Sequence, residues 1–424
     1  MTKEQERRAA ITKDRADPLA RFKNEFHCPV KKGKPVIYFC GNSLGLQPKL
    51  AADYLDKEMK KWREYAVEGH FEGEDPWMYY YKLSKDPLSV LVGAKTHEVV
   101  CMNNLTTNLH LMLGSFYRPQ GERKKLLIEK GAFPSDHFAA TTFMKLMGVD
   151  PKVDLVELVI PEDGYVDIQT ITKQIKAIGE ELALALLPGI QYYTGQFFNL
   201  KAISEACHEV GAYAGFDLAH AIGNLPLSLH DDGADFAVWC SYKYLNSGPG
   251  NVSGVFVHEK HSMDTSFPRL GGWWGQDETI RFKMENVFQP MTGADGWQLS
   301  NMNIISTAIH HASLSIFEQA GIKNLRAKSV ELTGFLEHLL RQSEIISRQV
   351  TLLTPPNKEE RGCQISIFLQ HHGKEIFDHL IDHGVILDWR EPNVIRAAPV
   401  PLYNSFQEVY EFVEILEDAF EKYA

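Results

Sequence analysis

Through its middle part, the chain alternates short apolar runs with amphipathic segments of helix length. The apolar runs lie at 99–102, 125–128, 153–160, 182–187, 212–216, 236–240 and 255–257. The helix-length segments lie between them at 107–117, 137–147, 168–178 and 201–210. Strands that alternate with helices indicate βαβ units and a mostly parallel sheet with helices on both faces. We therefore predict one large α/β domain over about 50–260.

The C-terminal part follows a different pattern. Apolar residues at 332, 335, 336, 339 and 340 have the spacing of an amphipathic helix. Strands are expected at 364–369 and near 385–389 and 393–396, with helices near 374–382 and from about 405. This order predicts a smaller α+β domain. We divide the chain into an N-terminal segment 1–45 that packs on the small domain, a large domain 46–305 and a small domain 306–424.

Composition narrows the class of protein. The 424 residues are 44% hydrophobic and 23% charged, as in ordinary globular proteins, and the net charge of −11 argues against nucleic acid or an anionic membrane as main partner. No apolar run approaches the ~18 residues of a membrane span, and the charged N-terminus does not resemble a secretory signal. The six cysteines form no CxxC pair. We predict a reduced, cytoplasmic protein without a metal site.

The segment 212–254 carries the most specific chemistry. Asp217 ends one predicted strand, and Lys243 follows the next one. Alone, such an aspartate would be read as a helix cap and such a lysine as a surface residue. Together, with Gly248-Pro249-Gly250 just beyond them, they favour pyridoxal phosphate (PLP) chemistry. A lysine amine can carry the cofactor aldehyde, and a carboxylate can pair with the pyridine nitrogen.

Motifs along nearly the whole chain resemble those of the kynureninase family, which belongs to the PLP-dependent enzymes of fold type I, in the class V aminotransferase superfamily. Lys243 and Asp217 match the superfamily. The motifs are YFCGNSLGLQP (38–48), LTTN (105–108), FPSD (133–136), YYTGQ (192–196), DLAHAIGN (217–224), SYKY (241–244), GGWWG (271–275), RFKM (281–284), LSN (299–301) and VIRAAPVPLYNS (394–405). The resemblance implies a large PLP-binding domain with a mostly parallel sheet and a smaller α+β C-terminal domain.

The resemblance also implies roles for individual residues. Lys243 would carry the cofactor and move protons, Tyr242 would be a general acid, and Asp217 would bind the pyridine nitrogen. Phe133 would stack on the ring, beside which His220 would lie, and the start of the helix at 105–106 suits a phosphate. The implied cofactor contacts are Leu105, Thr106, Phe133, Pro134, Ser135, Asp136, Asp217, His220, Tyr242, Lys243, Trp273 and Asn301.

The substrate side is implied in the same way. Arg396 would bind the α-carboxylate, because its guanidinium can form two parallel hydrogen bonds. His70, Ser43 and Asn301 match positions at the aryl end of the substrate pocket. Asn301 and Trp273 would reach the cofactor of a neighbouring subunit, so the resemblance implies a homodimer with shared sites. Pro188 departs from the family, which often has a hydroxyl residue near the phosphate there.

The implied activity is hydrolysis of L-kynurenine to anthranilate and L-alanine, or of 3-hydroxykynurenine to 3-hydroxyanthranilate and L-alanine, in tryptophan breakdown or NAD precursor synthesis. Two activities of the same superfamily stay open as alternatives. A cysteine desulfurase needs a nucleophilic cysteine on a mobile loop, for which Cys363 is the candidate, although its place at the start of a predicted strand favours a structural role. A class V aminotransferase would need a keto acid. The intact lysine, aspartate and arginine set disfavours a binding protein without activity.

Overall fold

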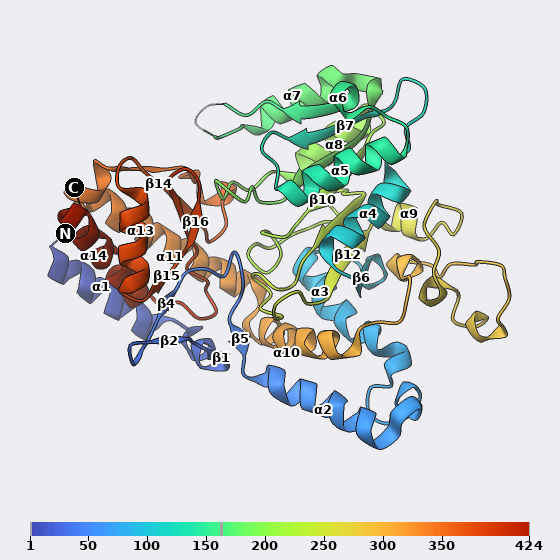
Figure 1. The fold of residues 1–424 in the computed structure, drawn as a ribbon, viewed down its shortest axis with the longest axis horizontal. Coiled ribbons are helices and arrows are strands. Elements are labelled where there is room, and N and C mark those ends of the chain that lie inside the picture. The colour runs from blue at the N-terminus through green and yellow to red at the C-terminus, as the bar shows by residue number, and fades with distance from the viewer. Residues whose placement is uncertain (1, 162–163, 424) are drawn as a thin grey trace.

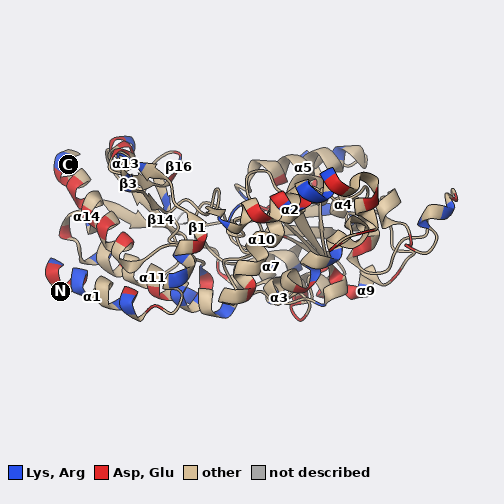
Figure 2. Cartoon of the chain, turned by 90° about the horizontal axis from the view of Figure 1, so that it is seen from below, with Lys and Arg blue, Asp and Glu red and all other residues tan. Residues whose placement is uncertain are grey.

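The computed structural model describes residues 2–161 and 164–423. Two units lie side by side in it (Figure 1). The smaller unit, at left, contains both ends of the chain, and the larger unit, at right, contains the middle of the sequence. Charged residues of both signs are interspersed along the helices of both units (Figure 2). Among the described residues, no helix is long and apolar enough to cross a membrane.

The larger unit is built on a seven-stranded sheet with the order β6-β12-β11-β10-β9-β7-β8. Every neighbouring pair is parallel except the two pairs formed by β12. The sheet is therefore mostly parallel, and the predicted fold class is confirmed. Its strands are β6 (Val99–Met102), β7 (Lys125–Glu129), β8 (Leu155–Leu158), β9 (Leu182–Pro188), β10 (Tyr213–Asp217), β11 (Phe236–Trp239) and β12 (Ser253–Val257).

Helices cover both faces of this sheet, so successive strand residues are buried against different cores. Val100 and Ile128 belong to the core beneath α4 and α5, whereas Cys101 and Leu127 belong to the core beneath α7 and α8. Burial on both faces explains why the strands appear in the sequence as continuous apolar runs. The helices of this unit are α2 (Leu50–Tyr65), α3 (Lys85–Val92), α4 (Leu105–Phe116), α5 (Pro134–Leu146), α7 (Ile168–Ile178), α8 (Leu200–Glu209) and α10 (Ile304–Ala320).

The strand expected at 153–160 is wrong in its first part. Residues Pro151–Asp154 form a short helix, α6, and β8 begins only at Leu155. The side chain of Asp150 accepts a hydrogen bond from the backbone N–H of Lys152, and Pro151 stands at the first helical position. Both features start helices. Val153 is consequently 67% exposed, although it looks like a strand residue in the sequence.

The smaller unit has an antiparallel sheet with the order β13-β14-β17-β16. The N-terminal segment joins this unit, because α1 packs on α14 and β4 (Ile37–Tyr38) pairs with β15 (Val385–Ile386). The division after residue 305 stays a prediction; it falls at the start of α10, which packs on α2. The unit's other elements are α1 (Lys3–Ala16), α11 (Ile322–Gln342), β13 (Val350–Leu352), β14 (Ile365–Leu369), α13 (Gly373–Asp382), β16 (Asp388–Arg390), β17 (Val394–Ala397) and α14 (Phe406–Tyr423).

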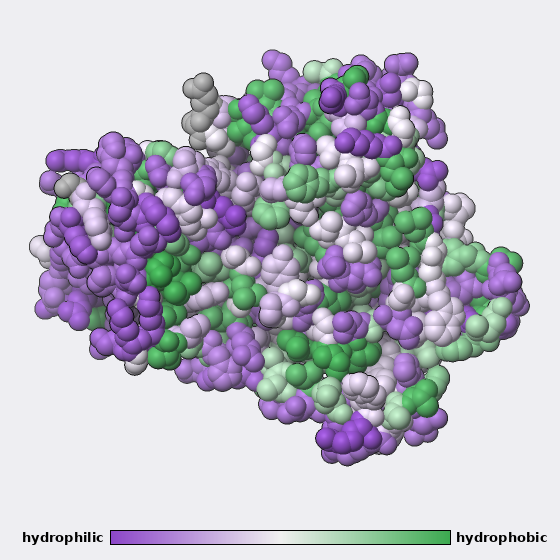
Figure 3. Space-filling view, in the orientation of Figure 1, coloured by the Kyte–Doolittle hydropathy of each residue, from purple (hydrophilic) through white to green (hydrophobic). Residues whose placement is uncertain are grey.

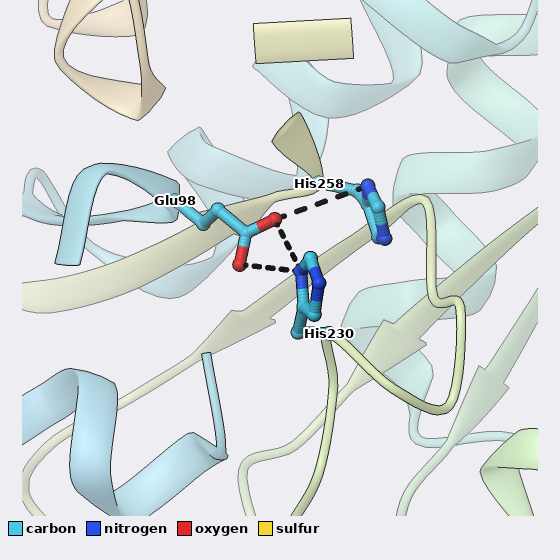
Figure 4. Close-up of side chains that lie close together, drawn as sticks. All are labelled: Glu98, His230 and His258. Atoms are coloured by element: carbon cyan, nitrogen blue, oxygen red, sulfur yellow. Dashed lines mark hydrogen bonds and ion pairs between the residues drawn. The ribbon is translucent and has the colours of Figure 1, made fainter. Parts of the chain in front are cut away.

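A buried carboxylate joins three segments at the start of β6 (Figure 4). Glu98 is fully buried, and its two oxygens lie 2.9 and 3.1 Å from Nδ1 of His230. One oxygen also accepts the backbone N–H of Glu259 at 2.7 Å, and the other accepts that of Lys95 at 2.8 Å. Glu98 thus ties the start of β6 to the loop around 230 and to the end of β12.

His258 completes this group without making it a metal site. Its Nδ1 lies 3.8 Å from Glu98 but accepts the backbone N–H of Lys260 at 3.2 Å. The rings of His230 and His258 are stacked, with centroids 4.8 Å apart and planes inclined by 16°. A metal ion lies in the plane of each imidazole that binds it, and two stacked rings share no such point. We assign the group a structural role.

We expect Glu98→Ala to destabilise the folded chain strongly, because it leaves two partly buried backbone N–H groups and an imidazole without their acceptor. The loss should be about 3 kcal/mol or more. The matched control is Glu259→Ala, which removes a half-exposed partner of Lys95 and His97 and should change stability by less than about 1 kcal/mol. Denaturant unfolding followed by circular dichroism measures both. Equal, small effects would contradict the structural role of Glu98.

Candidate active site

A pocket opens where the carboxyl ends of the parallel strands meet. Glu129 ends β7, Asp217 ends β10, and Tyr242 and Lys243 follow β11. Ligands of open α/β sheets bind at this edge. The residues that line the pocket are Leu105, Thr106, Glu129, Phe133, Ser135, Asp136, Pro188, Ile190, Tyr192, Asp217, Ala219, His220, Tyr242 and Lys243. The structure therefore brings together nine of the predicted site residues.

Lys243 and His220 lie in direct contact in this pocket. The amine nitrogen Nζ of Lys243 is 3.1 Å from Nε2 of His220. Burial, with the positive charges of Lys243 and Arg396, holds the pKa of His220 well below its usual value. The imidazole is therefore neutral and accepts a hydrogen bond from the lysine amine. Nδ1 of His220 is buried and has no partner among the described residues.

Three carboxyl groups face one another on the floor of the pocket. Asp217 is buried at the end of β10, and its Oδ1 accepts the backbone N–H of Ala219 at 2.7 Å. Burial and then the negative charge of Asp217 raise the pKa of Asp136 well above its usual value. The same two causes raise the pKa of Glu129 to about 8. Burial raises the pKa of Asp217 as well, but the backbone N–H of Ala219 and the positive charge of Lys243 oppose this shift. We therefore assign the negative charge to Asp217, while the other two groups hold protons at neutral pH.

Hydroxyl and helix-end donors also line the pocket. Thr106 is near the start of α4, whose N-cap Asn104 accepts the backbone N–H of Thr107 at 3.0 Å. The hydroxyl of Thr106 lies 2.9 Å from that of Ser135, near the start of α5. Two helix N-termini and two hydroxyls at one place suit a phosphate group. Pro188 also lines the pocket and has no donor to add.

Aromatic side chains form part of the wall of the pocket. The ring of Phe133 lies 5.8 Å from Nζ of Lys243 and contacts Tyr192 edge-on, with ring centroids 5.4 Å apart. Pro134 occupies the first turn of α5 and fixes the chain after Phe133, but it does not line the pocket. Burial raises the pKa of Tyr242, so its phenol stays protonated. Tyr242 is therefore able to donate a proton or a hydrogen bond.

Besides Pro134 and Arg396, four predicted residues lie outside this pocket. Trp273 is 45% exposed, and its indole nitrogen donates to the backbone oxygen of Arg281 at 3.3 Å. Asn301 is exposed, and neither residue lines the pocket of its own chain. Nδ1 of His70 lies 3.1 Å from the backbone oxygen of Val67, and half-buried Ser43 also stands apart from the pocket lining.

Arg396 lies behind the pocket wall instead of on its surface. It is 1% exposed and forms two bonds to the carboxylate of Asp388, from Nε at 3.0 Å and from Nη2 at 2.7 Å. Its Nη1 donates to the backbone oxygen of Tyr192 at 2.6 Å. Tyr192 lines the pocket, so this residue connects the arginine to the site.

Sequence reasoning missed Glu129 and Tyr192. Glu129 is the last residue of β7, directly after the apolar run that ends at residue 128. An acidic residue at the carboxyl end of a buried strand was the signal, and it is the same signal that identified Asp217. Tyr192 lies in the YYTGQ motif, but its side chain has no feature that separates a pocket aromatic from a core aromatic.

The pocket fits PLP by the chemistry of its residues. The hydroxyls of Thr106 and Ser135 lie near two helix N-termini, the carboxylate of Asp217 and the amine of Lys243 line the same pocket, and Oδ1 of Asp136 is buried without a partner among the described residues. Solved structures with the same fold include a cysteine desulfurase from Thermococcus onnurineus, with a TM-score of 0.75, 17% identity and coverage of 91% of this chain and 95% of that one. A cysteine desulfurase from Escherichia coli matches with a TM-score of 0.76 and 14% identity, over 96% and 99% of the two chains. Fold and site define the class of PLP-dependent enzymes of fold type I.

Sequence comparison identifies the family within this class. A kynureninase from Flavobacterium psychrophilum is 51% identical over 406 residues, which cover 95% of this chain and 96% of that protein. A kynureninase from Stenotrophomonas maltophilia is 50% identical over 412 residues, 96% and 97% of the two chains. The family described as "Kynureninase C-terminal domain" matches residues 325–416. The chain belongs to the kynureninase family.

Because the pKa of Glu129 is raised, the stability of the folded chain should depend on pH. An unfolded glutamate titrates near about 4.3, whereas Glu129 in the folded chain titrates at about 8. Between these values the folded chain holds a proton that the unfolded chain has lost, so this group lowers stability as pH rises through the window. Glu129→Gln stays neutral and should raise the Tm of the apoprotein over wild type by more at pH 8 than at pH 5.

The matched control for this test is Glu157→Gln, which changes an exposed glutamate on the neighbouring strand β8. It should shift the Tm by the same small amount at both pH values. If Glu129→Gln also gave equal shifts at pH 5 and pH 8, Glu129 would be ionised in the pocket and the assignment of its proton would be wrong.

Proposed function

We propose that this chain hydrolyses L-kynurenine to anthranilate and L-alanine, and 3-hydroxy-L-kynurenine to 3-hydroxyanthranilate and L-alanine. The observation that carries the proposal is the contact between Lys243 and His220 above the buried carboxylate of Asp217, in a chain about half identical to kynureninases over nearly its full length. The pathway would be tryptophan breakdown or the synthesis of an NAD precursor.

The cofactor in this proposal is PLP, which supplies an electron sink for the bonds at the substrate amino-acid carbon. Lys243 would hold it through its amine, and Asp217 would pair with its ring nitrogen. Thr106, Ser135 and the N–H groups at Leu105 and Thr106 would bind its phosphate, and Phe133 would cover its ring. A solved relative of the same fold, 16% identical, is described as a variant with glycine covalently linked to its PLP cofactor.

Lys243 is the residue placed to move the substrate proton. Its amine is held by the neutral His220, and within the part of the chain that the structure describes no ion pair joins it to a carboxylate. A neutral hydrogen-bond partner leaves the nitrogen free to take a proton from the substrate α-carbon and to return it at the next step. Asp217, buried and ionised, stabilises positive charge at the ring nitrogen throughout. Asp136 and Glu129 keep their protons, so the floor of the pocket carries one negative charge.

Tyr242 is the candidate general acid. Burial raises the pKa of its phenol, so the group is fully protonated at neutral pH. It follows β11 directly and lies next to Lys243 in the chain, and both side chains line the pocket. A protonated phenol there would give its proton to the carbon released when the bond between the two halves of the substrate breaks.

The substrate contacts rest on Arg396 for the α-carboxylate and on His70, Ser43 and Asn301 for the aryl end. His70 and Asn301 each carry a group that can hydrogen-bond a ring hydroxyl, which favours acceptance of 3-hydroxykynurenine. None of these three residues lines the pocket of its own chain. The proposed role of Asn301 depends on the second subunit described below.

The desulfurase alternative has little support from the thiol on which it depends. Cys363 is buried, and its backbone N–H donates to Oδ1 of Asn224 at 2.9 Å. Burial raises the pKa of Cys363 to about 12. A nucleophilic cysteine needs an accessible, ionised sulfur. The aminotransferase alternative differs in needing a keto acid to complete its cycle.

We expect purified, PLP-loaded protein to form alanine and the aromatic acid in equal amounts from L-kynurenine, without added keto acid. Lys243→Ala should reduce kcat to the background rate, because the proton at the α-carbon then has no acceptor, while the cofactor still binds non-covalently. The two products are followed by chromatography and the cofactor by absorbance. Normal turnover by Lys243→Ala, or a strict need for a keto acid, would contradict the proposal.

We infer that the chain acts as a homodimer in the cytoplasm. The support is a projecting segment, residues 263–293, at the right of Figure 1, where hydrophobic side chains lie on the surface (Figure 3). All six cysteines are free thiols, which agrees with a reducing compartment. Trp273 and Asn301 point to shared sites, since they match cofactor positions but lie outside their own pocket. The exposed apolar residues of the segment are Met263, Leu270, Trp273, Phe282, Met284, Val287 and Phe288.

Mixing two inactive variants tests the shared site. Lys243→Ala lacks the reactive amine, and Trp273→Ala lacks the contact that we assign to the neighbouring subunit. If Trp273 acts across the interface, a mixed dimer has one site with both residues intact, and mixing should restore up to about a quarter of wild-type kcat when the subunits exchange at random. The activity of the mixture and its mass by light scattering are the measurements. No gain on mixing proven dimers would place Trp273 in its own site.

A further inference from the structure

Arg396 is held before any substrate arrives. Its guanidinium has five N–H groups, of which one at Nε and one at Nη2 meet the two oxygens of Asp388, at 3.0 and 2.7 Å. One N–H at Nη1 donates to the backbone oxygen of Tyr192 at 2.6 Å. In residues 2–161 and 164–423, the two other N–H groups, one on each terminal nitrogen, have no acceptor. A guanidinium binds a carboxylate with two parallel bonds through N–H groups on two of its nitrogens.

Charge explains why a carboxylate is needed there. Arg390 also pairs with Asp388: its Nε lies 2.9 Å from Oδ1, and its Nη2 donates to Oδ2 at 3.3 Å. Two guanidinium groups therefore share one carboxylate, and the group keeps one positive charge. Arg396 is nearly fully buried, and a buried cation without a counter-ion is strongly destabilising. Asp388 therefore keeps Arg396 charged beside the pocket in the free enzyme, and the spare positive charge is complementary to one anion.

Arg396 and Arg390 lie next to residues of the pocket. Tyr192 supplies the carbonyl that holds Arg396, lines the pocket, and contacts Phe133 edge-on at 5.4 Å. Arg390, whose side chain is 34% exposed, lies 5.8 Å from the ring of Tyr192. The positive charge of Arg396 also lowers the pKa of His220, which contacts Lys243.

We propose that Asp388 is a positioning residue for the substrate α-carboxylate: it fixes one edge of the Arg396 guanidinium so that the other edge is presented to the substrate. The proposal deepens the function proposed above and rests on it. Asp388 itself touches no substrate. It acts through orientation, because a guanidinium that can rotate about its side-chain bonds loses affinity for an anion that it must bind in two-point geometry.

The test is Asp388→Asn in the PLP-loaded protein. We expect KM for L-kynurenine to rise about tenfold or more with kcat little changed, because the lost contact acts on ground state and transition state alike. The dissociation constant of L-alanine, which carries the α-carboxylate, should rise by the same factor. That of the amine analogue of kynurenine, which lacks the carboxylate, should stay within about twofold of wild type.

Two further variants serve as controls. Asp378→Asn removes an exposed carboxylate of the same unit that pairs with Lys374, and it should change KM by less than about threefold. Asp388→Glu keeps the charge and should recover part of the affinity for alanine; it also carries the test if Asp388→Asn does not fold, as judged by circular dichroism and cofactor absorbance.

Several outcomes would overturn the proposal. They are an unchanged or lower KM in Asp388→Asn, a parallel loss of affinity for the amine analogue, and an effect of Asp378→Asn as large as that of Asp388→Asn. A wild-type protein that does not cleave kynurenine would instead refute the proposed function. The binding of alanine and of the amine analogue would still test the role of Asp388, since neither measurement needs turnover.

Discussion

The buried negative charge of Asp217 is the constraint on which the rest of the site depends. A carboxylate inside a protein needs hydrogen bonds and a cation nearby. The backbone N–H of Ala219 provides the first, and the positive charges of the pocket provide the second. Because this charge is fixed, the two neighbouring carboxyl groups are driven to hold protons. One strand end thereby determines the protonation of three side chains.

The same constraint extends to the lysine and the histidine. A charged Lys243 stabilises Asp217, but it also disfavours protonation of His220. His220 is consequently a neutral acceptor, and the lysine amine is held by a partner that does not compete for its proton. A carboxylate in place of His220 would bind the ammonium form and withdraw it from chemistry. The arrangement of charge, more than the identity of any one residue, makes the amine available.

A seam of hydrogen bonds connects this site to the small unit. The backbone oxygens of Tyr193 and Thr194 accept the hydroxyls of Ser366 and Thr354, each at 2.6 Å. The backbone oxygen of Tyr192 accepts Nη1 of Arg396 at 2.6 Å. Side chains of the small unit thus hold the backbone that forms one wall of the pocket. A shift of the small unit would move this wall together with the arginine, so the cofactor side and the substrate side of the site are mechanically linked.

The sequence determines some of these features more directly than others. The large sheet was predictable because burial on both faces leaves unbroken apolar runs, and Asp217 and Lys243 stood out because polar residues that end such runs meet at one edge. The strand predicted to begin at residue 153 was wrong because the helix-start signal of Asp150 and Pro151 outweighs one apolar side chain.

The places of Trp273, Asn301, His70 and Ser43 could not be derived from periodicity, since each lies in a loop whose position is set by distant contacts. The same limit applies to Arg396, whose partner Asp388 lies beside it because β16 and β17 pair as antiparallel strands. The fold therefore follows from the pattern of apolar and polar residues. A site built between two units depends on the contacts that join them. Enzymes of one fold can differ in chemistry through those contacts alone.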